Sequence, residues 1–145
     1  METLYVNTDG GSRGNPGPAG IGVAFCNGNG DLVHGYKEYI GPATNNQAEY
    51  RAIIKALLLL SKSKWLAKND NKDSKVICRL DSKLVVEQIN GNYKVKNEGI
   101  IVLLGKLNEI KKDMKVTLCF VYVPREENKI ADKLVNEALD QALKK

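Results

Sequence analysis

The order of two kinds of hydrophobic pattern along the chain most constrains its fold. Three strand-like segments come first, at residues 3–9, 19–26 and 32–40, separated by glycine-rich turns. Helical and strand-like patterns then alternate, and the segments that we expect are helices at about 45–62, 82–90, 97–111 and 127–143 and strands at 75–80 and 115–123. An antiparallel meander followed by such alternation predicts a mixed sheet with helices on its faces. We see no repeat or linker in the 145 residues, so we expect one domain spanning residues 1–145.

Composition excludes several classes of protein. The chain is 43% hydrophobic and 27% charged, as in ordinary globular proteins, and no apolar run approaches the roughly 18 residues that a membrane span needs. Its start, METLYV, is strand-like and lacks the features of a secretion signal. Cys26, Cys78 and Cys119 are widely spaced inside apolar runs, which favours buried reduced thiols over a disulfide or zinc framework. We therefore expect a cytoplasmic protein without membrane contact.

The net charge of +5 indicates a polyanionic partner, although excess lysine can also serve solubility alone. The lysine-rich segment KSKWLAKNDNKDSK contains Trp65 and offers a second contact surface for such a partner. Lysines at helix ends and a tryptophan that packs on the core explain the same segment more simply.

Four acidic residues occupy unusual positions in the expected elements. Asp9 and Asp81 each end a strand, Glu49 leads the apolar stripe of a helix, and Asp132 lies near the start of the last helix. Caps and turns would explain each acid singly. However, the carboxyl ends of parallel neighbouring strands meet at one edge of a sheet, which would bring Asp9 and Asp81 together. Carboxylates about 4 Å apart repel by roughly 4 kcal/mol per pair at an effective dielectric near 20, so such a cluster requires a cation. Oxygen ligands without His or Cys suit Mg²⁺ or Mn²⁺.

Four segments of the chain resemble the four motif regions of type 1 ribonuclease H, in the same order. They read TDGGSRGNPGPAGIGVAF, TNNQAEYRAIIKAL, RLDSKLVVEQI and ENKIADKLVNEAL. The resemblance covers about residues 3 to 140. It implies a ribonuclease H-like α/β fold, in which a five-stranded mixed sheet has three antiparallel strands followed by parallel strands, with helices on both faces.

The resemblance also implies an activity. Proteins of this family are endonucleases that hydrolyse the RNA strand of RNA–DNA hybrids and leave 5′-phosphate and 3′-hydroxyl ends. Matched position by position, Asp9, Glu49, Asp81 and Asp132 are the catalytic acids that bind metal. The implied cofactor is Mg²⁺, with two ions per site when substrate is bound, and Mn²⁺ is a possible substitute.

Contacts with the nucleic acid are implied in the same way. The bare backbone of Gly10, Gly11 and Ser12 would lie beside the scissile ribose, where side chains would block approach to its 2′-hydroxyl. The positions that match phosphate or minor-groove contacts of the family are Asn15, Thr44, Asn45, Asn46, Gln47 and Asn97. Helix capping and turn formation explain these six equally well. Lys83 could reach a phosphate, and an exposed lysine is the simpler description.

The chain departs from the commonest bacterial pattern in two places. The loop YVPREENKIAD lacks the usual histidine, and the single histidine, His34, falls in an early strand. The candidate accessory residues in this loop are Arg125, Glu126 and Glu127 as substitutes for the histidine, and Asn128 as a residue that orients Asp132. The basic, tryptophan-containing protrusion is also missing, since only NGNYK joins VVEQI to VKNEG. We therefore expect weak, salt-sensitive binding of the hybrid. The sequence does not determine the oligomeric state, and we take a monomer as the default.

Two other functions remain open from the sequence. A nuclease of the same fold could cleave double-stranded RNA or branched DNA, because four carboxylates and two metal ions do not choose the duplex. A non-catalytic nucleic-acid-binding module could keep the fold without the chemistry. The presence of all four acids argues against this second alternative.

Overall fold

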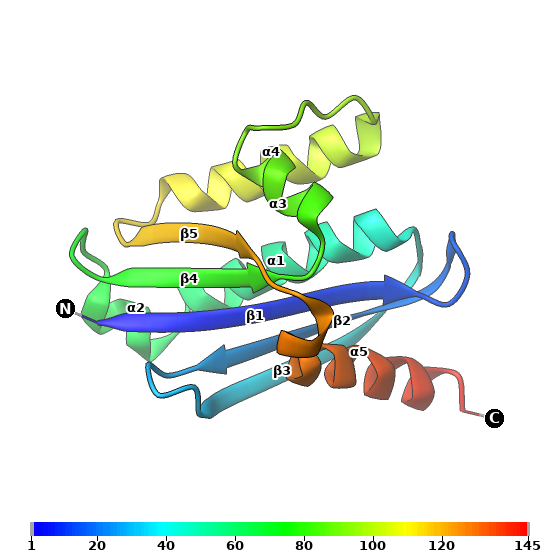
Figure 1. Ribbon diagram of the computed structural model, residues 1–145, viewed down its shortest axis with the longest axis horizontal. Helices are drawn as coiled ribbons and strands as arrows, with labels where there is room; N and C mark the ends of the chain where they lie inside the picture. The colour runs from blue at the N-terminus through cyan, green and yellow to red at the C-terminus, as the bar shows by residue number, and fades with distance from the viewer. Residues whose placement is uncertain (1, 145) are drawn as a thin grey trace.

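Five strands form one mixed sheet, with the order β3-β2-β1-β4-β5, in the computed structural model, which describes residues 2–144 (Figure 1). The strands are β1 (Thr3–Ser12), β2 (Gly17–Cys26), β3 (Leu32–Ala43), β4 (Lys75–Leu80) and β5 (Thr117–Tyr122). The first three are antiparallel, whereas β4 is parallel to both β1 and β5. This arrangement confirms the predicted fold class.

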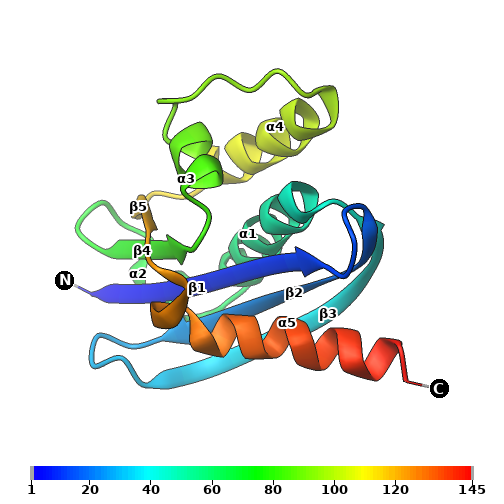
Figure 2. The ribbon, with the colours of Figure 1, turned by 45° about the vertical axis from the view of Figure 1, so that its right-hand side comes forward.

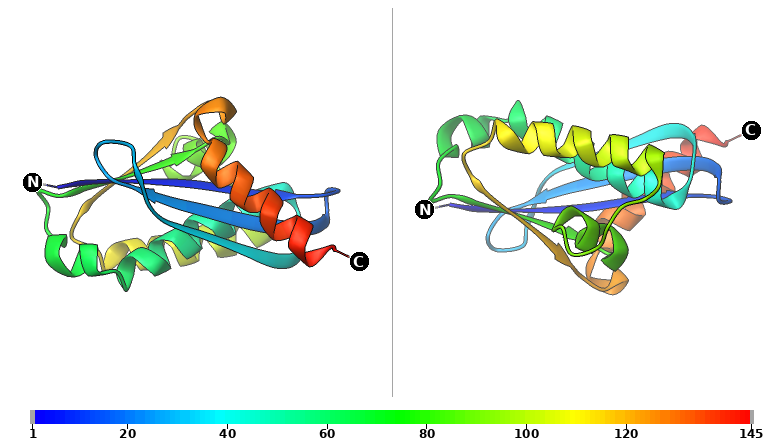
Figure 3. Two further views of the ribbon diagram at one scale, coloured as in Figure 1. Left: turned by 90° about the horizontal axis from the view of Figure 1, so that it is seen from below. Right: turned by 90° about the horizontal axis from the view of Figure 1, so that it is seen from above.

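Helices cover both faces of the sheet. They are α1 (Asn45–Ser61), α2 (Lys64–Asn69), α3 (Lys83–Ile89), α4 (Glu98–Lys112) and α5 (Lys129–Ala142), with a 3₁₀ turn, η1 (Arg125–Glu127), before α5. Helix α1 packs on β1 and β2, and α4 packs on α1. Helix α5 crosses β1, β2 and β3 on the opposite face (Figures 2 and 3). None of the helices described is long and apolar enough to cross a membrane.

The core lies between the sheet and α1. Alternate residues of a strand point to the same face, so every second residue of β4 is buried beneath the helices. The fully buried apolar side chains at the centre of the core are Val6, Val23, Ile53, Leu57, Leu60, Val76, Leu80, Val85 and Leu107. This packing fixes both β1 and β4 against α1, and hence the edge of the sheet where the acids lie.

The prediction that the first strand ends at Asp9 is wrong. Strand β1 continues to Ser12, because Gly10, Gly11 and Ser12 pair with Ile21, Gly20 and Ala19 of β2. The chain reverses only at residues 13–16. The two glycines were interpreted as a loop, but a glycine inside a strand also marks a place where another backbone approaches closely. Asp81, in contrast, directly follows β4 as expected.

The structure adds one helix to those expected and shows the surroundings of Trp65, His34 and the three cysteines. Helix α2 was not expected, and it begins where the Ser63 side chain accepts a hydrogen bond from the Leu66 N–H. Trp65 is half-buried against the core, in line with the simpler of its two interpretations. His34 lies on β3 and is exposed. All three cysteines are free thiols, of which Cys119 is only half-buried.

Candidate active site

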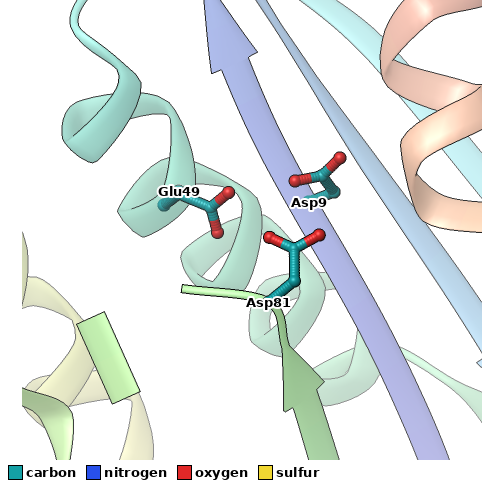
Figure 4. Close-up of side chains that lie close together, drawn as sticks. All are labelled: Asp9, Glu49 and Asp81. Atoms are coloured by element: carbon teal, nitrogen blue, oxygen red, sulfur yellow. The ribbon is translucent and has the colours of Figure 1, made fainter. Parts of the chain in front are cut away.

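Three acidic side chains converge at the edge of the sheet where β1 and β4 run parallel. Asp9 belongs to β1, Asp81 follows β4, and Glu49 lies on α1, yet one carboxylate oxygen from each lies within 4.8 Å of the others (Figure 4). Asp9 is 5% exposed and Glu49 is 6% exposed, whereas Asp81 is half-buried. The pairing of β1 with β4 and the packing of α1 therefore bring these three acids together. In the sequence, Glu49 lies 40 positions after Asp9, and Asp81 lies 32 positions after Glu49.

Because Gly10 has no side chain, α1 can pack closely on β1 and bring Glu49 to the sheet. A Cβ atom at Gly10 would lie 2.2 Å from the Ala48 carbonyl oxygen and 2.6 Å from the Glu49 nitrogen, so only glycine fits there. The Gly10 N–H instead donates a hydrogen bond to Glu49 Oε1 at 3.3 Å. Close packing against α1 thus explains why residue 10 is a glycine. The sequence had suggested a different reason, open space for the substrate, which is not needed at this position.

Burial and crowding change the protonation of this cluster. Burial, together with the charges of Asp81 and Asp132, raises the pKa of Asp9 from its ordinary 3.8 to about 7. Burial, with the adjacent Asp9, also raises the pKa of Glu49 well above 4.5. Without a cation the cluster therefore keeps a proton at a pH where free carboxyls are ionised.

The cluster has the properties of a divalent cation site. Glu49 Oε2 is buried and has no hydrogen-bond partner among residues 2–144, so one ligand atom is free. The donor set consists of carboxylate oxygens alone, which suits a hard divalent ion. A cation would also offset the burial and the mutual repulsion that raise these pKa values.

The fourth acid, Asp132, borders the cluster. It lies in the first turn of α5 and is half-buried. Asp132 lines the same hollow, of about 460 Å³, as Asp9 and Glu49, and its charge contributes to the raised pKa of Asp9. It is not one of the three acids whose oxygens lie within 4.8 Å. The structure therefore groups Asp9, Glu49 and Asp81 within 4.8 Å and places Asp132 beside Asp9 at the margin of this group.

Asn128 holds Asp81 and not Asp132, which differs from the prediction. The Asn128 side chain is fully buried, and its Nδ2 donates to the Thr8 carbonyl oxygen at 2.9 Å and to Asp81 Oδ2 at 3.2 Å. This amide consequently ties the start of α5 to both β1 and the end of β4. Helical spacing places Asn128 one turn before Asp132, whereas its contact with Asp81 depends on tertiary packing.

A polar groove continues from the acids towards the loop between α3 and α4. A second hollow, of about 340 Å³, is lined by Asn15, Thr44, Asn45, Asn46, Gln47, Gln88, Val95, Lys96, Asn97 and Ile100. Asn45 and Asn46 also line the hollow that contains the acids, so the two hollows are contiguous. All six residues that the resemblance assigned to phosphate or minor-groove contacts therefore gather in one groove.

The same residues have observed structural roles. Thr44 and Gln47 form a capping box at the start of α1, and Asn97 caps α4. Asn45 Oδ1 accepts a hydrogen bond from the Ser12 N–H, and Asn15 Oδ1 accepts one from the Asn45 N–H. These bonds orient the side chains along the groove, and their contacts with nucleic acid stay predictions.

The remaining candidates lie in different surroundings. Gly11 is open, because a Cβ atom there would meet nothing closer than 4.0 Å, and Arg125 lines the acidic hollow. Lys83, Glu126 and Glu127 are exposed and line neither hollow. Sequence reasoning missed Gln88, which lines the groove and accepts a hydrogen bond from the buried Tyr50 hydroxyl. The spacing of Tyr50 and Gln88 gives no sign of this contact.

Comparison with known proteins gives consistent matches over almost the whole chain. A family model described as reverse transcriptase-like matches residues 7–138. The chain is 39% identical over 142 residues to the ribonuclease HI of Halobacterium salinarum, covering 96% of the chain and 65% of that protein. It is 38% identical over 140 residues to a bifunctional protein of Mycobacterium tuberculosis, of which the chain spans only 36% of the length.

Solved structures agree with these relatives. LC11-RNase H1, isolated from compost by a metagenomic approach, has a TM-score of 0.89 and 46% identity, with 99% of each chain covered. The same protein has been crystallised with an RNA/DNA hybrid, and that structure gives a TM-score of 0.88 at 45% identity, covering 97% of this chain and 99% of the other. A shared fold at this identity, together with the carboxylate cluster in its expected place, shows that the chain belongs to the type 1 ribonuclease H family.

Proposed function

We propose that this protein is a ribonuclease H, an endonuclease that hydrolyses the RNA strand of RNA–DNA hybrids to 5′-phosphate and 3′-hydroxyl ends. The observation that carries the proposal is the convergence of Asp9, Glu49 and Asp81 within 4.8 Å beside a polar groove. The relative crystallised with an RNA/DNA hybrid, at 45% identity, supports the choice of substrate.

Asp9, Glu49 and Asp81, with Asp132 at the margin, would hold the metal ions. When bound, two Mg²⁺ ions supply an activated water and neutralise charge on the leaving oxygen, and Mn²⁺ could replace them. The buried Glu49 Oε2 is a free ligand atom, and the raised pKa of Asp9 shows that the site favours neutralisation of its charge. No protein nucleophile is required.

The chain itself supplies orientation and access. Asn128 fixes the Asp81 carboxylate, and the Gly10 N–H fixes Glu49 Oε1. Gly11 leaves the strand open on the side of the hollow, so a ribose can approach the acids there. We assign phosphate and minor-groove contacts to the amides along the groove, in particular Asn15 and Asn45.

The test is cleavage of end-labelled duplexes. RNA–DNA, RNA–RNA and DNA–DNA duplexes of one sequence are incubated with Mg²⁺, with Mn²⁺, or with a chelator. We expect cleavage of the RNA strand of the hybrid that requires a divalent ion and stops when Asp81 is replaced by Asn. Exclusive cleavage of the DNA duplex, or cleavage that survives the chelator, would contradict the proposal.

Binding is expected to depend strongly on salt. The chain has a net charge of +5 and only the segment NGNYKVKN between α3 and α4, so contacts with phosphates must come from a short groove. Fluorescence anisotropy with a labelled hybrid, measured over a range of salt concentrations, checks this. Tight binding that persists at high salt would show that other contacts dominate.

A further inference from the structure

We propose that Gly22 of β2 is a positioning residue that sets the place of Asp132 relative to Asp9. This inference rests on the proposed function, because it assigns a purpose to the position of the fourth acid. Sequence reasoning did not select Gly22, and Gly22 does not line the hollow that contains the acids.

The evidence is the contact between Gly22 and the backbone of α5. A Cβ atom at Gly22 would lie 2.3 Å from the Ala131 carbonyl oxygen, 2.9 Å from Leu134 Cβ and 3.1 Å from the Val135 nitrogen. Two of these atoms belong to the backbone, which cannot rotate away as a flexible side chain can. The first turns of α5 therefore occupy the volume that any other residue at this position would fill.

This contact lies directly beside the acids. Gly22 pairs with Asp9 in the antiparallel register of β1 and β2, so the two residues face the same side of the sheet. Ala131 is fully buried and immediately precedes Asp132. The distance between α5 and β2 at Gly22 consequently determines how closely Asp132 approaches Asp9.

A similar contact between a strand glycine and a helix backbone occurs on the opposite face of the sheet. The Ala48 carbonyl oxygen lies where a Cβ atom of Gly10 would be, and Ala48 immediately precedes Glu49. In both helices, then, an alanine that contacts a strand glycine precedes the acid. The repetition indicates that these two glycines set the positions of the acids, beyond a general need for close packing.

The polar attachments of α5 lie on either side of this contact. The ion pairs Arg13–Asp140, at 2.7 Å, and Lys37–Glu137, at 3.5 Å, lie one to two turns beyond Asp132 and are partly exposed. Asn128 ties the start of the helix to β1 and β4. A side chain at position 22 would therefore tilt the turn that carries Asp132 away from the sheet between these two attachments.

The test compares Gly22→Ala with a matched control, Gly35→Ala. Gly35 lies on β3 under the same helix, but its Cβ atom would meet only the end of the Leu134 side chain, at 3.5 Å. We expect Gly22→Ala to lower kcat on the hybrid by about 100-fold with little change in KM, because a displacement of about 1 Å is enough for such a loss. Gly35→Ala should stay within about twofold of the wild type.

A double-mutant cycle with Asp132→Asn separates positioning from general damage. If Gly22 acts through Asp132, adding Gly22→Ala to Asp132→Asn produces no further loss of kcat. Losses that multiply would overturn the inference. If Asp132→Asn alone keeps wild-type activity, the proposed role of Asp132 fails, which is a different result from the failure of Gly22→Ala.

A structural measurement completes the test without relying on activity. Crystal structures of the metal-free variants should show the turn around Ala131 displaced from β2 in Gly22→Ala and unchanged in Gly35→Ala. If Gly22→Ala does not fold, Gly20→Ala replaces it, since its Cβ atom would meet the Val135 carbonyl oxygen at 3.2 Å and produce a smaller displacement of the same helix. A Gly20→Ala variant with both the kcat and the helix position of the Gly35→Ala control would overturn the inference.

Discussion

Helices α1 and α5 each bring one acid to the same edge of the sheet, but the two helix starts are held in different ways. At the start of α1, Thr44 and Gln47 complete a capping box, and Glu49 is buried with one oxygen bonded to the Gly10 N–H. At the start of α5, Asn128 makes no side-chain cap, and its Nδ2 donates to the Thr8 carbonyl oxygen and to Asp81 Oδ2. Glu49 is thus held by the capped start of α1 and by its bond to Gly10 of β1. The start of α5 is held by the bonds from Asn128 to Thr8 and Asp81.

This difference separates the acids into two classes. Asp9, Glu49 and Asp81 form a cluster that the fold holds in place, with the consequence that two of their pKa values are raised. Asp132 is half-buried at the margin, and its position depends on how α5 lies on β2. The three clustered acids are therefore positioned by β1, β4 and α1, whereas Asp132 is positioned by α5.

The largest effect is expected where α1 meets β1. Gly10→Ala places a Cβ atom 2.2 Å from the Ala48 carbonyl oxygen, so α1 must shift and carry Glu49 away from Asp9. We expect about 100-fold or greater loss of kcat and a loss of about 1–3 kcal/mol in the free energy of unfolding. Hybrid cleavage and urea denaturation measure these two quantities.

Gly11→Ala is the matched control for this prediction. Its Cβ atom would meet no atom closer than 4.0 Å, so it should cost little stability. If it lowers kcat/KM while the stability is unchanged, Gly11 lies beside the substrate as the family resemblance implies. Equal losses of stability in both variants would refute the packing role of Gly10.

The second prediction concerns the pH dependence of stability in the absence of metal. The folded protein keeps the Asp9 proton up to a pH of about 7, whereas the unfolded chain loses it near 3.8. Raising the pH from about 4 to 7 should therefore lower the free energy of unfolding, by about 4 kcal/mol at most from this residue. The raised pKa of Glu49 acts in the same direction.

Asp9→Asn should flatten this dependence and stabilise the metal-free protein above a pH of about 7. Adding Mg²⁺ to the wild type should restore the lost stability, because the ion binds only the folded state. Thermal denaturation at a series of pH values, with and without Mg²⁺, gives the comparison. A wild-type stability that rises between pH 4 and 7, with no difference from Asp9→Asn, would contradict the crowding of the acids.

The third prediction concerns the amide that holds α5. Asn128→Ala leaves the buried Thr8 carbonyl oxygen without its donor and frees Asp81, so we expect a loss of about 1–3 kcal/mol in stability and about 10–100-fold in kcat. Asn90→Ala is the control, since Asn90 also donates to a backbone carbonyl, that of Phe120, but contacts no acid. Comparable kcat values in the two variants would show that Asn128 has no role in orienting Asp81.

The smallest effect is expected at the capping box. Thr44→Ala removes the side-chain oxygen that accepts from the Gln47 N–H and should cost about 1 kcal/mol. If Thr44 also contacts a phosphate, the affinity for the hybrid falls as well, with a shallower dependence on salt. Anisotropy titrations beside denaturation curves separate the two roles, and unchanged affinity would limit Thr44 to capping.

The sequence predicted the fold through the order of its patterns. The apolar run KVICRL predicted a strand, which β4 confirms, although only every second residue of β4 is buried. The preceding meander indicated antiparallel pairing, which the sheet also confirms. The acids could be selected because a carboxylate on an apolar stripe, as at Glu49, or directly after a buried strand, as at Asp81, is unusual without a ligand.

The contacts that position these acids could not be predicted in the same way. Gly10 and Gly22 were read as turn and strand glycines, although their role depends on helices that pack from opposite faces. The bond from Asn128 to Asp81 joins residues 47 positions apart, and local spacing pointed to Asp132 instead. One sign was present, since Gly20 and Gly22 alternate in AGIGVAF and so leave the middle of one face of β2 without side chains.

The central claim is that these crowded carboxylates act by holding divalent ions, and one measurement tests it most directly. Cleavage of the labelled RNA strand in an RNA–DNA hybrid is followed over a Mg²⁺ titration for the wild type and for Asp9→Asn, with circular dichroism as a check of folding. The account predicts Mg²⁺-dependent cleavage by the wild type and none by a folded Asp9→Asn variant at any Mg²⁺ concentration. Near wild-type turnover by that variant would contradict it.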